Sequence, residues 1–151
     1  MLMRLTNKKF RENYIKTVKL DFQLVKREVH GSAVLLIVYD TVCERFGAHN
    51  KFQRRRHGIL LVYDVTNLQS FGNIMSWVQG IKDCNWDAVI IFLVGNKCDL
   101  EMERKVSTKE GRDLAQMFNI CFFETSAKNS TNIEELFTQI SSLIIHLNNT
   151  N

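Results

Sequence analysis

A seven-residue apolar run, AVIIFLV at residues 88–94, leads directly into GNKCDL at residues 95–100. A short apolar run that ends at a glycine is typical of a strand buried in a parallel sheet. In open α/β sheets, ligands bind outside the carboxyl ends of such strands. The turn after residue 94 is therefore a candidate binding site.

This turn carries the pattern N-K-x-D in Asn96, Lys97 and Asp99. An ionised aspartate accepts two hydrogen bonds, which suits a ring edge that presents an N–H beside an amino group. Guanine has that edge and adenine does not. From these four residues alone, an ordinary strand-to-turn junction with polar residues remains an equal alternative.

A second strand-to-loop junction points the same way. A short apolar run at residues 121–123, CFF, is followed by ETSAK at residues 124–128. With both loops in this order, the chain resembles the guanine-nucleotide-binding domain of the Ras-type small GTPases. The likeness includes YDVTN at residues 63–67, and FRENYIKT at residues 10–17 is similar to the first switch of the Rab branch.

The resemblance implies one α/β domain over residues 1–147, followed by a short polar tail at residues 148–151. The fold expected is the P-loop-NTPase-like, three-layer arrangement with a mostly parallel sheet. Hydrophobic periodicity predicts a hairpin over residues 19–39, strands at 58–63, 88–94 and 121–123, and helices from about residue 69 and over 107–118. The last helix is predicted to bury one continuous stripe: Ile133, Leu136, Phe137, Ile140, Leu143, Ile144 and Leu147.

The resemblance also assigns roles in a guanine site. Asp99 would hold the base edge and Asn96 would brace the loops. The stems of Lys97 and Lys128 would cover the ring. The Ala127 N–H would meet the base carbonyl, and Ser126 would support its loop.

The phosphate side of the site differs from the family. The motif G-x-x-x-x-G-K-[ST], whose backbone N–H groups and lysine cradle phosphates, does not occur in these 151 residues. The sheet is therefore expected to be incomplete, lacking the first strand that the family places between residues 33–39 and 58–63. Three outcomes stay open: those two strands pair directly, another chain donates a strand, or the product is unstable.

The segments that sense the terminal phosphate also depart from the family pattern. D-T-A-G-Q-E-R-F becomes DTVCERF at residues 40–46, which is one residue shorter and lacks the glutamine that positions the attacking water. Thr17 and Asp40 align with magnesium-side positions and are candidate Mg²⁺ ligands, although Thr17 also fits an exposed loop hydroxyl. Lys19 stands where a glycine is usual. GTP/GDP binding is expected to be weak, and hydrolysis is not expected.

Composition agrees with a single cytoplasmic domain. A net charge of +4 is mild, and the densest basic run, Arg54–Arg56, lacks the aromatic platforms that would indicate nucleic-acid binding. The four cysteines show no metal-like spacing and fit reduced thiols. The carboxyl end contains no cysteine for prenylation, so no autonomous membrane anchor is expected.

Three hypotheses follow. The first is a Rab-like protein of vesicle trafficking and protein transport that recognises guanine but has degraded phosphate machinery. The second is a nucleotide-independent interaction module, a pseudo-GTPase that binds Rab effectors or regulators through residues 10–22. The third is a non-functional truncated product.

Overall fold

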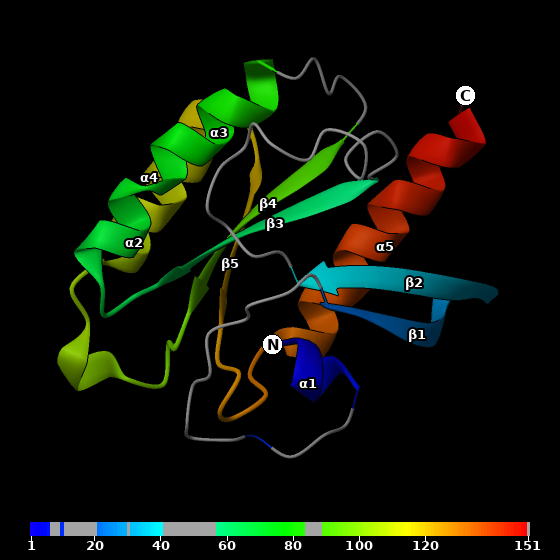
Figure 1. Ribbon diagram of the computed structural model, residues 1–151, viewed down its shortest axis with the longest axis horizontal. Helices are drawn as coiled ribbons and strands as arrows, with labels where there is room; N and C mark the ends of the chain where they lie inside the picture. Colours follow the sequence, from blue (N-terminus) through cyan, green and yellow to red (C-terminus); the bar gives the residue numbers. More distant parts are fainter. Residues whose placement is uncertain (7–9, 11–20, 30, 41–56, 84–88, 151) are drawn as a thin grey trace.

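The computed structural model describes residues 1–6, 10, 21–29, 31–40, 57–83 and 89–150 (Figure 1). Its strands form two separate sheets. One is an antiparallel pair and the other is a three-stranded parallel sheet in the order β3-β4-β5. The strands are β1 (Asp21–Val29), β2 (Ser32–Asp40), β3 (Gly58–Asp64), β4 (Ile90–Asn96) and β5 (Cys121–Thr125).

Helices cover both faces of the parallel sheet, which confirms the three-layer α/β prediction. The helix predicted from about residue 69 is split into α2 and α3, and α4 begins at the predicted Ser107–Glu110 capping box. The helices are α1 (Leu2–Leu5), α2 (Leu68–Gly72), α3 (Ile74–Asp83), α4 (Thr108–Phe118) and α5 (Ile133–Thr150), with a short 3-10 turn η1 at Glu101–Glu103.

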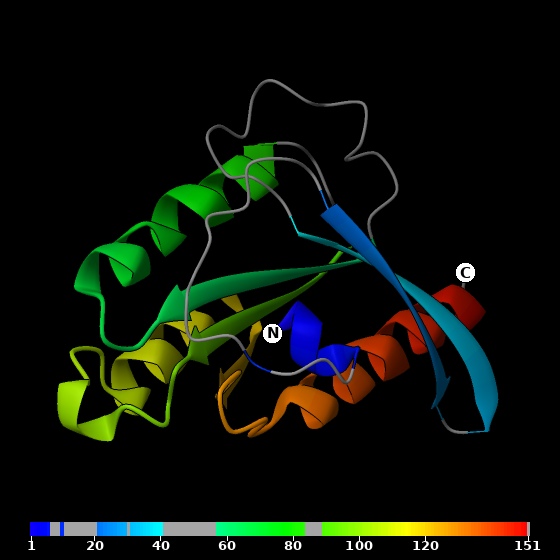
Figure 2. The same ribbon diagram turned by 60° about the horizontal axis from the view of Figure 1, so that its bottom comes forward.

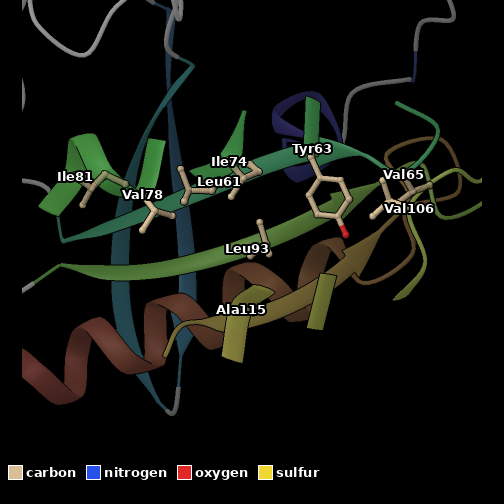
Figure 3. Packing of buried hydrophobic residues seen from close by; sticks show 9 residues of the cluster. All are labelled: Leu61, Tyr63, Val65, Ile74, Val78, Ile81, Leu93, Val106 and Ala115. Atoms are coloured by element: carbon tan, nitrogen blue, oxygen red, sulfur yellow. The ribbon is translucent and has the colours of Figure 1, made fainter. Parts of the chain in front are cut away.

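Two hydrophobic clusters fill the space between these layers. In the first, side chains of β3 and β4 pack against α3 and α4 (Figure 3). Its buried members are Leu61, Tyr63, Val65, Ile74, Val78, Ile81, Leu93, Val106 and Ala115. On the opposite face, Phe92 and Val94 pack against α1 and α5. Alternate residues of β4 therefore enter different clusters, as the two-residue period of a strand requires.

The last helix differs from its prediction. Its first half buries Ile133, Leu136, Phe137 and Ile140, but Leu143 and Leu147 are 39% and 38% exposed. The predicted stripe was wrong at these two positions, which lie in the second half of α5 (Figure 1). The helix continues to Thr150, so residues 148–150 of the predicted polar tail form its end.

β1 and β2 form the predicted hairpin, with Leu24 opposite Ile37. In the part of the chain that the structure describes, β2 pairs only with β1, and β3 only with β4. Of the three outcomes that the sequence left open, direct pairing of the strands at 33–39 and 58–63 does not occur among the described residues. The hairpin packs its inner side chains Leu36 and Val38 into the cluster over α5, and it lies beside that helix (Figure 2).

Candidate functional site

The carboxyl ends of the three parallel strands lie in register. Asp64 is opposite Asn96, and Asn96 is opposite Thr125. The loops that follow β4 and β5 therefore start next to each other. All the residues that the sequence analysis assigned to a guanine site belong to these two loops, and the structure describes each of them.

Asn96 joins the two loops directly. Its side-chain oxygen, Oδ1, accepts hydrogen bonds from the Ala127 N–H at 3.2 Å and from the Thr125 hydroxyl at 3.3 Å. A backbone bond from the Cys98 N–H to the Thr125 carbonyl adds a third link, at 3.1 Å. From the family resemblance we expected the Ala127 N–H to bond to the base carbonyl. In this structure the Ala127 N–H donates to Asn96.

Lys97 is held at the neighbouring strand end. Its backbone is left-handed, with φ of 67°, and its Nζ lies 2.6 Å from Asp64 Oδ2. The other Asp64 oxygen accepts bonds from the Thr66 N–H at 2.9 Å and the Thr66 hydroxyl at 2.7 Å. Burial opposes ionisation of Asp64, but the bonds from Lys97 and Thr66 outweigh it and lower the pKa of this carboxyl.

Asp99 has a carboxylate oxygen, Oδ1, that is buried and has no hydrogen-bond partner among the described residues. Buried polar atoms in proteins are nearly always hydrogen-bonded, and leaving one unmade costs about 1–3 kcal/mol or more for a charged group. An adjacent N–H and amino group, as on guanine, would satisfy a carboxylate in this position. The residues present therefore fit a guanine base.

The loop after β5 is closed by its own hydrogen bonds. The buried Ser126 accepts a bond on Oγ from the Asn129 N–H at 3.0 Å, and its N–H donates to the Thr131 carbonyl at 3.1 Å. Two residues after Ser126, Lys128 is exposed. These contacts set the backbone path through Ala127, the residue bonded to Asn96.

Glu124, the first residue of ETSAK, has a structural role that the sequence analysis did not predict. Its carboxylate forms a bidentate pair with Arg104 at 2.7 Å and 3.2 Å and accepts the Thr108 hydroxyl at 3.1 Å. Bonds to Glu124, together with a bond to Glu101, raise the pKa of the Arg104 guanidinium. Glu124 thus ties β5 to α4 and to the loop after β4. No spacing rule connects residues 104 and 124, so the sequence carried no signal for this pair.

Of the two magnesium-side candidates, the structure describes only Asp40. Asp40 ends β2 in the hairpin, and its side chain is exposed. Thr17 lies outside the described residues, as do residues 11–20 of the predicted interaction segment and residues 41–46 of the shortened loop. Among the described residues, no three His, Cys, Asp or Glu side chains gather in a way that could hold a metal ion.

This arrangement, a parallel sheet between two helical layers with paired loops at its carboxyl edge, is the Ras-like α/β fold. The chain matches the Ras family over residues 1–146. It is 40% identical over 147 residues to the Ras-related protein Rab-13 of Canis lupus familiaris, covering 96% of this chain and 72% of that protein.

Relatives from plants and fungi show a similar level of sequence identity to this chain. The chain is 41% identical over 145 residues to the GTP-binding protein YPTM1 of Zea mays, covering 95% of this chain and 70% of that protein. It is 40% identical over 147 residues to the Ras-related protein SEC4 of Candida albicans, with the same coverage. The chain belongs to the Ras superfamily of small GTPases, as a Rab-type member. No helix in the described ranges is both long and apolar enough to cross a bilayer.

Proposed function

We propose that this chain is a Rab-type guanine-nucleotide-binding domain that recognises the base of GTP or GDP through the loops after β4 and β5. The observation that carries the proposal is the Oδ1 of Asp99, which is buried and has no hydrogen-bond partner among the described residues. It lies in a loop that Asn96 braces against Ala127. Guanine offers N1–H and its 2-amino group as two donors for this carboxylate.

The Asp99 carboxylate would also make the site selective for guanine over adenine. Adenine presents a lone pair at N1 and no amino group at C2, so its edge would leave the Asp99 carboxylate buried and unpaired. A site built to hydrogen-bond one base strongly rejects an analogue that lacks the matching donors. At about 1.5–3 kcal/mol for each charge-assisted bond, two bonds correspond to at least about 100-fold preference for guanine.

We propose that the phosphate-binding part of the site is degraded. The DTVCERF loop at residues 40–46 is one residue short and lacks the water-positioning glutamine, and Lys19 replaces a glycine. Phosphoryl transfer depends on positioned donors and charge, so we expect weak nucleotide binding and negligible hydrolysis. Thr17 and Asp40 would hold the Mg²⁺, which would supply positive charge to offset that of the phosphates.

A titration of the 151-residue chain with fluorescent GDP and fluorescent ADP tests the proposal. We expect measurable but weak GDP binding and at least about 100-fold weaker ADP binding. Asp99→Asn should abolish the preference because its amide places donors against the donors of guanine. Asp113→Asn, which alters an exposed ion pair with Lys109 on α4, is the matched control and should leave it unchanged.

Two results would contradict this function. Equal affinity for GDP and ADP would remove the base-recognition part. Submicromolar GTP binding by the chain alone, or steady GTP turnover, would instead remove the degraded-phosphate part. For the biological setting we propose vesicle trafficking and protein transport in the cytoplasm, as the Rab resemblance implies.

One observation favours a second function, that of a nucleotide-independent interaction module. One face of the β1–β2 hairpin exposes four large apolar side chains by more than half: Phe22 (53%), Leu24 (57%), Leu35 (53%) and Ile37 (51%). Leu24 is paired with Ile37, and Phe22 and Leu35 lie two residues away from them on the same face of their strands. Contiguous exposed apolar residues mark interaction surfaces. A Rab effector or regulator would contact this face together with residues 10–22.

A binding assay with an isolated Rab effector domain, in the presence and absence of GTP, tests this alternative. We expect equal binding in both conditions and at least about tenfold weaker binding for Leu24→Lys, since it places a charge on the apolar face. A control substitution, Lys82→Gln on the opposite helical layer, should not alter the affinity. Binding that requires GTP would contradict the module.

A further inference from the structure

Arg4 reaches from α1 to the loop that follows β5. Its Nε donates to the Ala127 carbonyl at 2.8 Å, and its Nη2 donates to the Lys128 carbonyl at 2.5 Å. One guanidinium thus donates hydrogen bonds to the carbonyls of two consecutive residues, which lie more than 120 residues away in sequence. The planar arginine fork suits this pair of acceptors, and a lysine ammonium does not reproduce it.

The backbone on both sides of Ala127 is held by these contacts. The peptide group before Ala127 is held through its N–H by Asn96, and the peptide group after it is held through its carbonyl by Arg4. Fixing both peptide groups fixes the backbone dihedral angles of the residue between them. Arg4 and Asn96 therefore act on the same short stretch of the loop from opposite sides.

Two contacts keep Arg4 itself in place. The next residue, Leu5, is 4% exposed and packs in the cluster between α1, β4 and α5, which anchors the helix. On the outer side, the Phe10 ring lies 5.7 Å from the Arg4 guanidinium carbon, a distance suited to a cation–π contact. Phe10 begins the predicted interaction segment, residues 10–22, so Arg4 links that segment to the base-recognition loop.

We propose that Arg4 is a positioning residue for guanine recognition, which holds the Ala127–Lys128 backbone in its base-binding conformation. This inference rests on the proposed guanine site, and it adds a residue from α1 to a site otherwise built from the two strand-end loops. Without Arg4, the backbone at Ala127 samples other conformations, and guanine must then restrict it on binding.

Three variants test the role. Arg4→Ala removes both bonds, and Arg4→Lys keeps the charge but not the fork. The matched control is Arg27→Ala, which removes another largely buried arginine that joins a strand of the amino-terminal half to α5 through Glu134. Thermal melts establish that each variant is folded, and Arg4→Lys carries the test if Arg4→Ala does not fold.

The first readout needs no nucleotide. The Ala127 and Asn129 N–H groups are hydrogen-bonded within the site, so their hydrogen exchange reports on the loop. We expect both Arg4 variants to speed exchange at these two amides at least about tenfold, and Arg27→Ala to leave it unchanged. Unchanged exchange in the Arg4 variants would overturn the proposal, as would equal acceleration in Arg27→Ala.

The second readout is affinity for GDP and ADP. We expect the Arg4 variants to bind GDP about tenfold more weakly and to lose part of the preference over ADP, whereas Arg27→Ala keeps it. GDP affinity and preference within twofold of the unaltered chain would overturn the role. If the unaltered chain does not prefer GDP, the proposed function fails, and the exchange experiment still decides whether Arg4 orders the loop.

Discussion

At the residue scale, Tyr63 is the least expected member of the core. Its side chain is 1% exposed, and its hydroxyl has no hydrogen-bond partner among the described residues. Burial, aided by the charges of Glu124 and Glu110, raises the pKa of this hydroxyl to about 12. The phenol therefore stays neutral at physiological pH and contributes to packing rather than to polar contacts (Figure 3).

Replacing Tyr63 with phenylalanine should leave the free energy of unfolding unchanged or raise it by up to about 1 kcal/mol. The reason is that it removes a buried oxygen that makes no bond but keeps the ring. Denaturant titration measures the difference. Tyr63→Ala is the control for ring packing and should lose about 3–5 kcal/mol. A loss above about 1 kcal/mol in Tyr63→Phe would show that the hydroxyl has a partner.

Asp64 gives a prediction about pH. Because hydrogen bonds lower its pKa in the folded chain, its contribution to stability is present above the ordinary aspartate pKa of about 3.9 and is lost as pH falls through the lower folded value. Asp64→Asn should therefore be less stable than the unaltered chain at about pH 7, and the difference should shrink below about pH 4.

Urea titrations at several pH values check this expectation. Asp113→Asn is the control, because its ion pair with Lys109 is exposed and contributes little at any pH. A stability difference for Asp64→Asn that stayed constant from neutral to strongly acidic pH would show that the lost contribution is not the ionised carboxylate.

At the element scale, the packing of α4 on the sheet depends on Gly111. A Cβ added there would lie 2.4 Å from the Tyr63 hydroxyl oxygen and 2.6 Å from Phe122 Cε2. The first atom is the hydroxyl oxygen of the buried Tyr63, and the second is a ring carbon of the half-buried Phe122. The absence of a side chain at Gly111 is what lets α4 approach β3 and β5 closely.

Gly111→Ala should lower the free energy of unfolding by about 1–3 kcal/mol because α4 must shift outward. Gly72→Ala is the matched control, since a Cβ there meets nothing within 4 Å. It should be neutral or stabilise α2 by up to about 1 kcal/mol, as alanine favours helix. Thermal and denaturant unfolding compare the two, and equal effects would contradict the close-approach argument.

At the scale of the whole molecule, the hairpin and the parallel sheet are held differently. β4 has a paired strand on each side, and Phe92, Leu93 and Val94 have no exposed surface. In the described part of the chain, β1 and β2 pair only with each other, and one face of the hairpin is exposed. The hairpin depends on Arg27 with Glu134 and on its inner apolar side chains.

Native-state hydrogen exchange should therefore divide the molecule into two units. Amides of β4 should exchange slowest, and those of β1 and β2 at least about tenfold faster, because the hairpin can open without breaking the parallel sheet. Arg27→Ala should widen this gap while leaving β4 unchanged. Equal protection of hairpin and sheet would show that they unfold as one unit.

Much of the local structure could be predicted. The apolar runs of the strands, the pairing of the hairpin strands and the capping box of α4 depend on nearby residues, and all agree with the structure. The stripe on α5 was predicted correctly over its first half. Leu143 and Leu147 share its period but are 39% and 38% exposed, and periodicity alone cannot reveal how deeply each position is buried.

The sequence by itself determined the α/β class and the Rab-type family, because strand periodicity and two loop motifs are local patterns. Only the tertiary structure decided which side chains meet. Arg4 bonds to the loop at Ala127, Glu124 pairs with Arg104, and Asp99 keeps a buried oxygen free of partners in the described chain. Such contacts join residues far apart in sequence, and their distances follow from how layers pack rather than from any spacing along the chain.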